Sequence, residues 1–178
     1  MQVTYLTYGN PSNQHLAVLD EIVHLLSPLN KLVSDDETKP VLKSLTGAVH
    51  PKMKFPGMRM DAVVNGVGVV CVMGNMLAVG TRCFSSLFHA NDGTISEQIF
   101  VTHAPCNAWM HEYRRGNKIM RVSNGNRIDS KHVKDMLDEI HPNLMKVPVS
   151  IISLQDHESL RQYHQFFRTV PQEPRVFP

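Results

Sequence analysis

The sequence predicts one α+β domain of three layers, α/β/α, with a mostly antiparallel mixed sheet between flanking helices. Three observations support this prediction. The chain has 178 residues, 42% of them hydrophobic, which is enough for a single domain with a substantial core. Runs of β-branched residues alternate with stretches whose apolar residues recur at helical spacing. The last third of the chain places a strand between two helices, and this order requires a crossover and some parallel pairing.

The chain is predicted to open with a strand and a helix. Residues 3–8 favour a strand because β-branched and aromatic side chains dominate them. Ser12 is a suitable helix N-cap, since its hydroxyl can accept from a backbone N–H of the first turn, and Pro28 marks the end. His15 and His24 lie beside the apolar stripe of this helix and are expected at the surface. The stripe consists of Leu16, Leu19, Ile22, Val23 and Leu26.

The middle of the chain is predicted to be rich in strands. A short helix is expected over residues 36–45, and residues 61–64 and 67–73 are apolar and β-branched, as in strands. Gly74-Asn75 is a turn signal. Residues 76–84 are therefore expected to return as the antiparallel partner of a hairpin.

The following segment is less uniform. Residues 95–104 favour a further strand. Residues 106–113 either continue the sheet or form a short helix, and both alternatives stay open. Residues 114–117, Arg-Arg-Gly-Asn, form a basic turn.

The last third is predicted to fold as helix, strand and helix. Asp129 or Ser130 caps the first helix and Pro142 ends it. Residues 147–154 are apolar on both parities, which is typical of a strand buried on both faces. Asp156 is expected to cap the final helix. The apolar positions of the two helices are Val133, Met136, Leu137 and Ile140, and then Leu160, Tyr163 and Phe167.

The loop before the first of these helices is the main chemical clue. Residues 123–127, Ser-Asn-Gly-Asn-Arg, bring small polar residues and a glycine to a helix N-terminus. Backbone N–H groups in such a loop and the helix dipole can together hold an anion. Arg121 and Arg127 flank the loop and can each bind a phosphate through two hydrogen bonds. The alternative is an ordinary turn, because Asn-Gly is a common turn signal.

This loop resembles the pyrophosphate loop of the GNAT superfamily of acyl-CoA N-acyltransferases. The family pattern is Arg/Gln-x-x-Gly-x-Gly/Ala, and this chain has Arg121-Val-Ser-Asn124-Gly125-Asn126. Asparagine therefore replaces both family glycines. Asparagine tolerates the left-handed backbone conformation better than most residues, so the loop is weakened and not excluded.

A second segment carries the same resemblance. The family has Asn-x-x-Ala and then a tyrosine seven residues after the asparagine. Here Asp156, Ser159 and Tyr163 keep that spacing. The resemblance implies a GNAT-like fold and a CoA-dependent N-acyltransferase with acetyl-CoA as the cofactor. A small molecule or a protein would then supply the amine that accepts the acyl group.

The resemblance also implies roles for individual residues. Tyr163 would be the general acid that protonates the leaving thiolate, although its place on an apolar face also fits a packed aromatic side chain. Glu112 is the expected base for the amine, with Glu97 and His103 as alternatives. The residues expected to hold the pyrophosphate are Arg121, Asn124, Gly125, Asn126 and Arg127.

A second function is compatible with the same resemblance. The two asparagines in the loop favour a non-catalytic structural or assembly protein, such as a virion component, that uses a GNAT-like fold. Such a protein would form a homo-oligomer or bind an assembly partner.

Composition excludes several classes of protein. A net charge of +2 gives no clear signal for nucleic-acid binding. No run of 18 apolar residues is present, and the first residues lack the pattern of a signal peptide. Three cysteines, an odd number, indicate reduced thiols. These features predict a protein of the cytoplasm or of a virion interior.

Five residues are of the types that bind zinc, but no metal site is predicted from them. Their spacing matches no recurrent zinc motif. A nucleophilic cysteine paired with a histidine is another interpretation of Cys106, with an inert buried thiol as the favoured alternative. The five residues are Cys83, His89, His103, Cys106 and His111.

Overall fold

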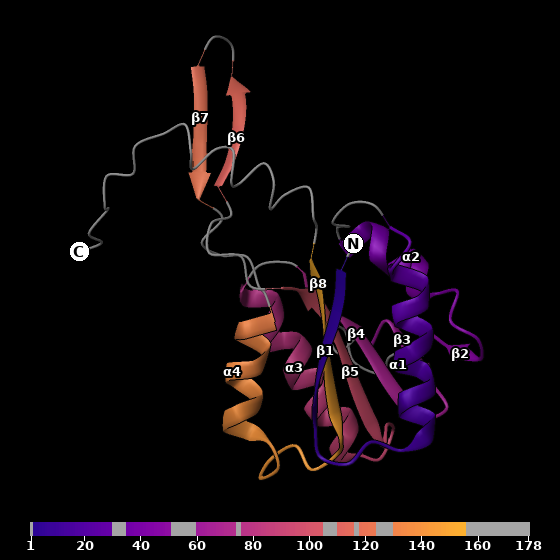
Figure 1. Cartoon of the computed structure of the whole chain (residues 1–178). Helices are drawn as coiled ribbons and strands as arrows, with labels where there is room; N and C mark the ends of the chain where they lie inside the picture. Colours follow the sequence, from indigo (N-terminus) through magenta and orange to yellow (C-terminus); the bar gives the residue numbers. More distant parts are fainter. Residues whose placement is uncertain are drawn as a thin grey trace.

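The described part of the chain forms one six-stranded mixed sheet with helices against it, and a separate two-stranded ribbon (Figure 1). The computed structural model describes residues 2–29, 35–50, 60–73, 76–104, 110–115, 118–123 and 130–155, with only the backbone for residues 35–37, 76–79, 110–115 and 118–123. In chain order the elements are β1 (Gln2–Tyr8), α1 (Asn13–Leu26), α2 (Asp35–Leu42), β2 (Ala48–Val49), β3 (Ala62–Val64), β4 (Val67–Cys71), α3 (Met76–Asn91), β5 (Glu97–His103), β6 (Met110–Arg115), β7 (Lys118–Ser123), α4 (Ser130–Ile140) and β8 (Val149–Gln155). The strand order in the sheet is β1-β8-β5-β4-β3-β2.

The centre of the sheet is parallel. β4, β5 and β8 run in the same direction, whereas β1 pairs antiparallel with β8. On the other side, β3 and β2 continue the sheet with antiparallel pairing. Every residue of β4 and β5 is buried, as is usual where both faces of a parallel sheet are covered.

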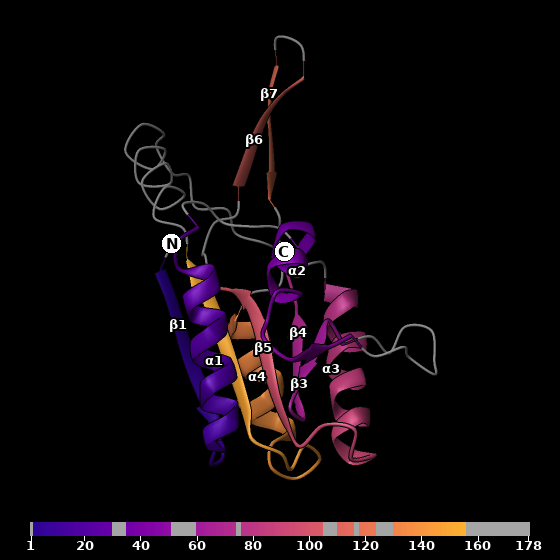
Figure 2. The ribbon, with the colours of Figure 1, turned by 90° about the vertical axis from the view of Figure 1, so that its right-hand side faces the viewer.

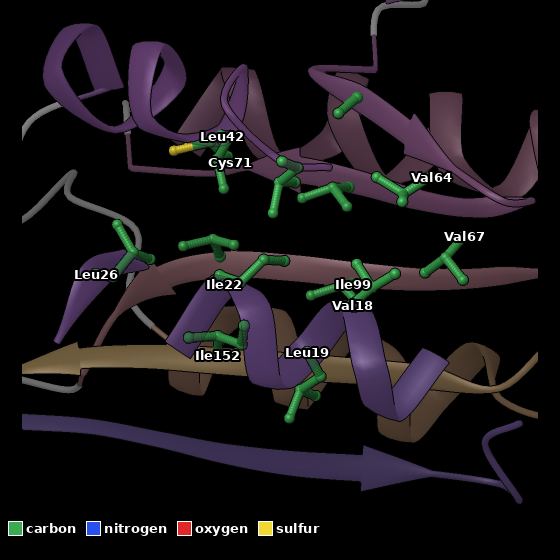
Figure 3. Packing of buried hydrophobic residues seen from close by; sticks show 14 of the residues in the cluster. Val18, Leu19, Ile22, Leu26, Leu42, Val64, Val67, Cys71, Ile99 and Ile152 are labelled. Atoms are coloured by element: carbon green, nitrogen blue, oxygen red, sulfur yellow. The ribbon is translucent and has the colours of Figure 1, made fainter. Parts of the chain in front are cut away.

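Helices α1 and α2 lie on one face of the sheet, and α3 and α4 lie on the other (Figure 2). On the first face, Val18, Leu19 and Ile22 of α1 pack with Ile99 of β5 and Ile152 of β8 (Figure 3). Burying an aliphatic side chain of this size stabilises the folded state by about 1.5–3 kcal/mol. This cluster therefore fixes α1 across the parallel strands.

The second face has its own core. Val133 and Leu137 of α4, together with Cys83 of α3, pack with Phe100 of β5 and Ile151 of β8. The alternation of side chains along β5 and β8 sends consecutive residues to opposite faces. Both faces of each central strand are therefore needed for the core, which explains why apolar residues occupy both parities of these strands.

The parallel strands give the sheet a distinct amino end and carboxyl end. At the amino end, β5 begins at Glu97 and β8 begins at Val149. At the carboxyl end, these strands finish at His103 and Gln155. The β6–β7 ribbon lies beyond the carboxyl end (Figures 1 and 2). None of the helices in the described ranges is long and apolar enough to cross a membrane.

The predicted GNAT-like fold is wrong. The sheet is mixed, with antiparallel pairing for β1–β8, β2–β3 and β3–β4, but its central strands β4, β5 and β8 are parallel. The error begins at residues 76–84, which were expected to be a returning strand and instead form the first half of α3. Because β4 and β5 pair in parallel, their connection must cross over the sheet, and α3 makes that crossing. The helical period is visible further along, where Cys83, Leu87 and Ala90 pack against the sheet at i, i+4 and i+7.

Several local predictions are confirmed. Residues 95–104 contain β5, residues 147–154 contain most of β8, and α4 follows the predicted helix. His24 is exposed as expected, but the prediction for His15 is wrong, because this side chain has no exposed surface. The final helix predicted from Asp156 lies outside the described residues.

Candidate functional site

Asp61 is fixed at the carboxyl end by the hairpin of β3 and β4. Its backbone N–H donates to the carbonyl oxygen of Val69 at 3.0 Å, and its Oδ2 accepts from the backbone N–H of Cys71 at 2.7 Å. The Nδ1 of His50 donates to the Asp61 carbonyl oxygen at 2.7 Å, since a carbonyl can only accept. The Asp61 side chain is 11% exposed. A rigidly held carboxylate therefore lies at the solvent boundary of this end.

Arg82 of α3 brings a positive charge to the same place. Its Nη2 lies 3.8 Å from Asp61 Oδ1, and 18% of its side chain is exposed. This separation is longer than that of a strong, two-bond arginine–carboxylate pair. Both side chains are mostly buried, and a small part of each is in contact with solvent.

The described residues do not fit a metal ion at Asp61. Hard cations such as Mg²⁺ require several oxygen ligands. Within the described ranges, no group of three His, Cys, Asp or Glu side chains is close enough to hold a metal ion. The guanidinium of Arg82 would also repel a cation bound to Asp61 Oδ1.

The β6–β7 ribbon concentrates positive charge beyond the same end. Its two strands pair antiparallel from Met110 with Ser123 to Arg115 with Lys118. Residues 110–123 contain four basic residues and one acidic residue, a net charge of +3, whereas the whole chain has +2. The rest of the chain is therefore net −1. The basic residues are Arg114, Arg115, Lys118 and Arg121, and the acidic residue is Glu112.

A buried polar network occupies the amino end. His15 Nε2 lies 2.7 Å from Ser150 Oγ, which in turn lies 2.8 Å from Thr7 Oγ1. On the other side of the imidazole ring, Glu97 Oε2 is 3.1 Å from Nδ1 without the angle of a hydrogen bond. His15 and Ser150 have no exposed surface. Because the four side chains come from α1, β8, β1 and β5, the network ties four elements together.

Glu97 also completes the N-terminal cap of α1. Ser12 Oγ accepts from the backbone N–H of His15 at 3.1 Å, the usual N-cap bond. In a capping box, an acidic or amide side chain three residues after the cap accepts from the backbone N–H of the cap residue. His15 occupies that position here, and Glu97 Oε2 accepts from the Ser12 N–H at 3.0 Å instead. Glu97 of β5 therefore takes the role that the residue three positions after the cap has in an ordinary capping box.

Ser150, His15 and Glu97 stand in the order of a hydrolase triad, but their burial excludes that role. A serine nucleophile must reach its substrate, and neither Ser150 nor His15 has exposed surface. Burial lowers the pKa of His15, and the negative charge of Glu97 opposes this effect in part. A neutral imidazole in a closed network is suited to holding the fold together.

A shallow pocket of about 200 Å³ lies beside the start of α4. Two lysines in its wall, Lys131 and Lys134, form ion pairs one turn along the helix with Asp135 and Asp138, which offsets their charge. The residues that directly precede Ser130 are outside the described ranges. The anion site expected at this helix N-terminus therefore stays a prediction. The pocket is lined by Leu6, Ser130, Lys131, Lys134, Ile151 and Ser153.

Most of the predicted acyl-CoA site cannot be placed. Asn124, Gly125, Asn126, Arg127 and Tyr163 lie outside the described residues. Acetyl-CoA binding by these residues is therefore untested.

The other predicted residues are distributed over three places. Glu112 and Arg121 lie directly opposite each other in the β6–β7 ladder. The alternative bases Glu97 and His103 are the first and last residues of β5, about 20 Å apart at the usual rise of a strand. Glu97 and His103 therefore cannot be alternatives within one site.

The possible zinc ligands are also separated where they are described. His103 belongs to the face of β5 that α1 covers, whereas Cys83 packs against the opposite face. Burial raises the pKa of the Cys83 thiol to about 12, which disfavours the thiolate that zinc requires. Cys106 lies outside the described residues, and only the backbone of His111 is described.

Two features of the structure were not expected from the sequence. Asp61 directly precedes β3, but its partners Cys71 and Arg82 lie 10 and 21 positions along the chain. Arg114 and Arg115 were expected in a basic turn and instead end strand β6 of the ribbon. The signal in each case lies in the tertiary arrangement.

Comparison with solved structures gives a similarity over most of the chain. No protein-family model matches the chain, and no curated protein matches it in sequence. A crystal structure of the restriction endonuclease BglII in complex with a DNA 16-mer has a similar fold, with a TM-score of 0.61. The match covers 88% of this chain and 79% of that chain, at 11% sequence identity. The chain therefore has a restriction-endonuclease-like fold.

This similarity corrects the functional predictions. The GNAT resemblance rested on two short segments, whereas the structural similarity extends over most of the chain. The acetyl-CoA-dependent acyltransferase derived from that resemblance is therefore wrong. The alternative, a non-catalytic virion or assembly protein with a GNAT-like fold, also depended on the GNAT-like fold, and it is therefore no longer supported.

Proposed function

We propose that this chain binds duplex DNA at the carboxyl end of its sheet. The observation that carries the proposal is the fold, which is shared over 88% of the chain with an endonuclease whose structure was solved with DNA. Because one fold can serve many functions, the residues at that end must also suit DNA.

The charges at the carboxyl end support this proposal. Affinity for DNA comes largely from arginine and lysine contacts with phosphates, whatever the base sequence. Arg82 lies at this end of the sheet, and the ribbon with a net charge of +3 lies beyond it. The whole-chain net charge of +2 gave no such signal, because it averages the basic ribbon with a remainder that is slightly acidic.

Binding is favoured over cleavage by the surroundings of Asp61. Metal-dependent nucleases hold their cations with carboxylates. In the described part of the chain, Asp61 belongs to no group of three potential ligands, and Arg82 stands 3.8 Å from it. The rigid hold on Asp61 nevertheless makes DNA cleavage the second candidate function.

Fluorescence anisotropy with a labelled duplex tests the proposal. We expect a dissociation constant of roughly 10⁻⁴–10⁻⁶ M on arbitrary sequence at physiological salt, and a linear fall of log K with log salt. A flexible acidic polypeptide of equal charge is the control for simple polyanion binding and should bind more weakly. No binding to DNA between about 50 and 200 mM salt would refute the proposed function.

The second candidate is tested with the same duplex. The protein is incubated with DNA in the presence of Mg²⁺ or Mn²⁺, and the products are separated by size. Cleavage that is lost in Asp61→Asn would establish a nuclease with Asp61 in its site. Binding without cleavage by the folded protein is the outcome we expect.

A further inference from the structure

We infer that the β6–β7 ribbon enters the major groove of duplex DNA, with Arg114, Arg115 and Lys118 near the inserted end. This inference rests on the proposed function and deepens it, because it names the element and the groove. It depends on three properties of the ribbon, namely its size, the distribution of its charge and its place in the molecule.

The size of the ribbon suits the groove. Each strand has six residues, so the ribbon is about 20 Å long at the usual rise per residue. The paired strands are separated by about 4.8 Å, and the major groove of B-form DNA is about 12 Å wide and 8.5 Å deep. A two-stranded ribbon is one of the two elements that this groove admits.

The charge of the ribbon is concentrated near its end. Arg115 and Lys118 are the last pair before the connection between the strands, and Arg114 belongs to the pair before it. Nearer the sheet, Arg121 is the ladder partner of Glu112, so the net charge of that pair is zero. The positive charge therefore increases along the ribbon away from the sheet.

The charge is also divided between the two faces. Successive residues of a strand belong to opposite faces, so Arg115 and Lys118 share one face and Arg114 belongs to the other. A phosphate backbone borders each side of the groove. A ribbon inserted between them meets negative charge on both faces, whereas a ribbon lying on a single backbone needs positive charge on only one.

The place of the ribbon is consistent with the rest of the interface. It lies beyond the carboxyl end of the sheet (Figures 1 and 2), the end where Asp61 and Arg82 meet. DNA gripped by the ribbon would therefore pass over the carboxyl end, and the buried network of the amino end would take no part in binding.

The test compares three full-length proteins by anisotropy with duplex DNA. They are the unaltered chain, a variant with Arg114→Ala, Arg115→Ala and Lys118→Ala, and the control Lys146→Ala, an exposed lysine at the amino end. We expect the triple variant to bind at least tenfold more weakly near 0.1 M salt, with a salt slope lower by about 3, because each phosphate contact contributes close to one. The Lys146 control should leave both quantities unchanged.

A charge-preserving variant and two further duplexes test whether the ribbon enters the major groove. The variant Arg114→Lys and Arg115→Lys should keep the salt slope, since both side chains carry the same charge. Duplex RNA of the same sequence has a major groove too deep and narrow for a ribbon. DNA whose cytosines carry glucosylated hydroxymethyl groups has a filled major groove. Both should bind severalfold more weakly than unmodified DNA.

The outcomes separate the inference from the proposed function. Failure of the unaltered chain to bind DNA would overturn both. Binding by the unaltered chain that the triple variant retains in full would overturn the ribbon's role and leave DNA binding intact. Equal affinity for RNA, glucosylated DNA and plain DNA would overturn groove insertion. Thermal unfolding of each variant checks that a loss of binding does not reflect a loss of fold.

Discussion

At the amino end of the sheet, His15 lies between Glu97 and Ser150, and the side chains of His15 and Ser150 have no exposed surface. At the carboxyl end, Asp61 and Arg82 meet loosely, at 3.8 Å and partly in solvent. Both ends carry polar groups of the kinds used in catalysis. The difference lies in access, because a closed network can only hold the fold together, whereas partly exposed charges can still interact with a ligand.

The comparison also shows why triad-like geometry is a poor guide to function. The distances around His15 would suit a nucleophilic serine, whereas Asp61 and Arg82 form only a long ion pair. Yet the serine and the imidazole of the first group have no exposed surface, whereas both members of the second are partly exposed. The following predictions test this contrast between a structural end and a binding end.

The largest expected effect is on stability at the amino end. His15→Ala removes one of the two hydrogen-bond partners of Ser150 Oγ, which keeps Thr7 Oγ1, and leaves a cavity beside Glu97. A lost hydrogen bond costs about 0.5–1.5 kcal/mol and the cavity adds to it, so we expect a loss of roughly 3 kcal/mol in the free energy of unfolding. In a chain of this length, such a loss lowers the unfolding midpoint by roughly 6–12 °C, measurable by circular dichroism.

His24 on the same helix provides the matched control for His15. It is exposed, so His24→Ala should change the free energy of unfolding by less than about 0.5 kcal/mol. Equal effects of the two substitutions would show that the network around His15 adds nothing to the fold. The folded His15→Ala protein should keep the DNA affinity of the unaltered chain.

The second prediction uses the pKa of His15. Burial lowers this pKa below its ordinary value of 6.5, so the unfolded chain takes up a proton at a higher pH than the folded protein does. Stability from the neutral imidazole is therefore present above pH 6.5 and is lost as the pH falls below it. The slope contributed by one such group is at most about 1.4 kcal/mol per pH unit.

Urea titrations at several pH values between 7.5 and 5 would measure this slope. The variant His15→Gln keeps an amide that can bond to Ser150, and it should show a flatter dependence than the unaltered chain. The matched control is His24→Gln, which removes an exposed histidine from the same helix. If His15→Gln retained the full slope, the titrating group would have to lie elsewhere.

The secondary structure that the sequence predicted correctly depends on local patterns. In α4, Val133 and Leu137 repeat at helical spacing and pack on the sheet as that spacing indicates. In β8, apolar residues on both parities match a strand with a core on each side. Such patterns need no knowledge of the rest of the chain.

The failures came from contacts that are distant in sequence. The turn signal at residues 74–75 suggested a hairpin, but β4 pairs with β3 on one side and with β5 on the other, and β5 begins at Glu97 after a helix. His15 is buried because Glu97 and Ser150, 82 and 135 positions away, surround its ring. Asp61 likewise forms its ion pair with Arg82, which lies on another element, α3. The binding end could therefore not be found from spacing alone.

The third prediction concerns Arg82 at the binding end. We expect Arg82→Gln to weaken DNA binding by roughly threefold to tenfold near 0.1 M salt and to lower the salt slope by about one, as for the loss of one phosphate contact. Thermal unfolding of the variant checks that a loss of binding does not reflect a loss of fold. An unchanged affinity would restrict the DNA interface to the ribbon.

The smallest expected effect is at Asp61, and its sign is opposite to that of Arg82. A carboxylate at a DNA-binding surface repels phosphate, although salt screens the repulsion beyond about 8–10 Å. Asp61→Asn removes this charge and keeps an oxygen that can accept from the backbone N–H of Cys71. We therefore expect DNA binding to become roughly twofold to fivefold tighter. Weaker binding would instead mean that Asp61 acts by orienting Arg82, and in that case the double variant would bind no worse than Arg82→Gln alone.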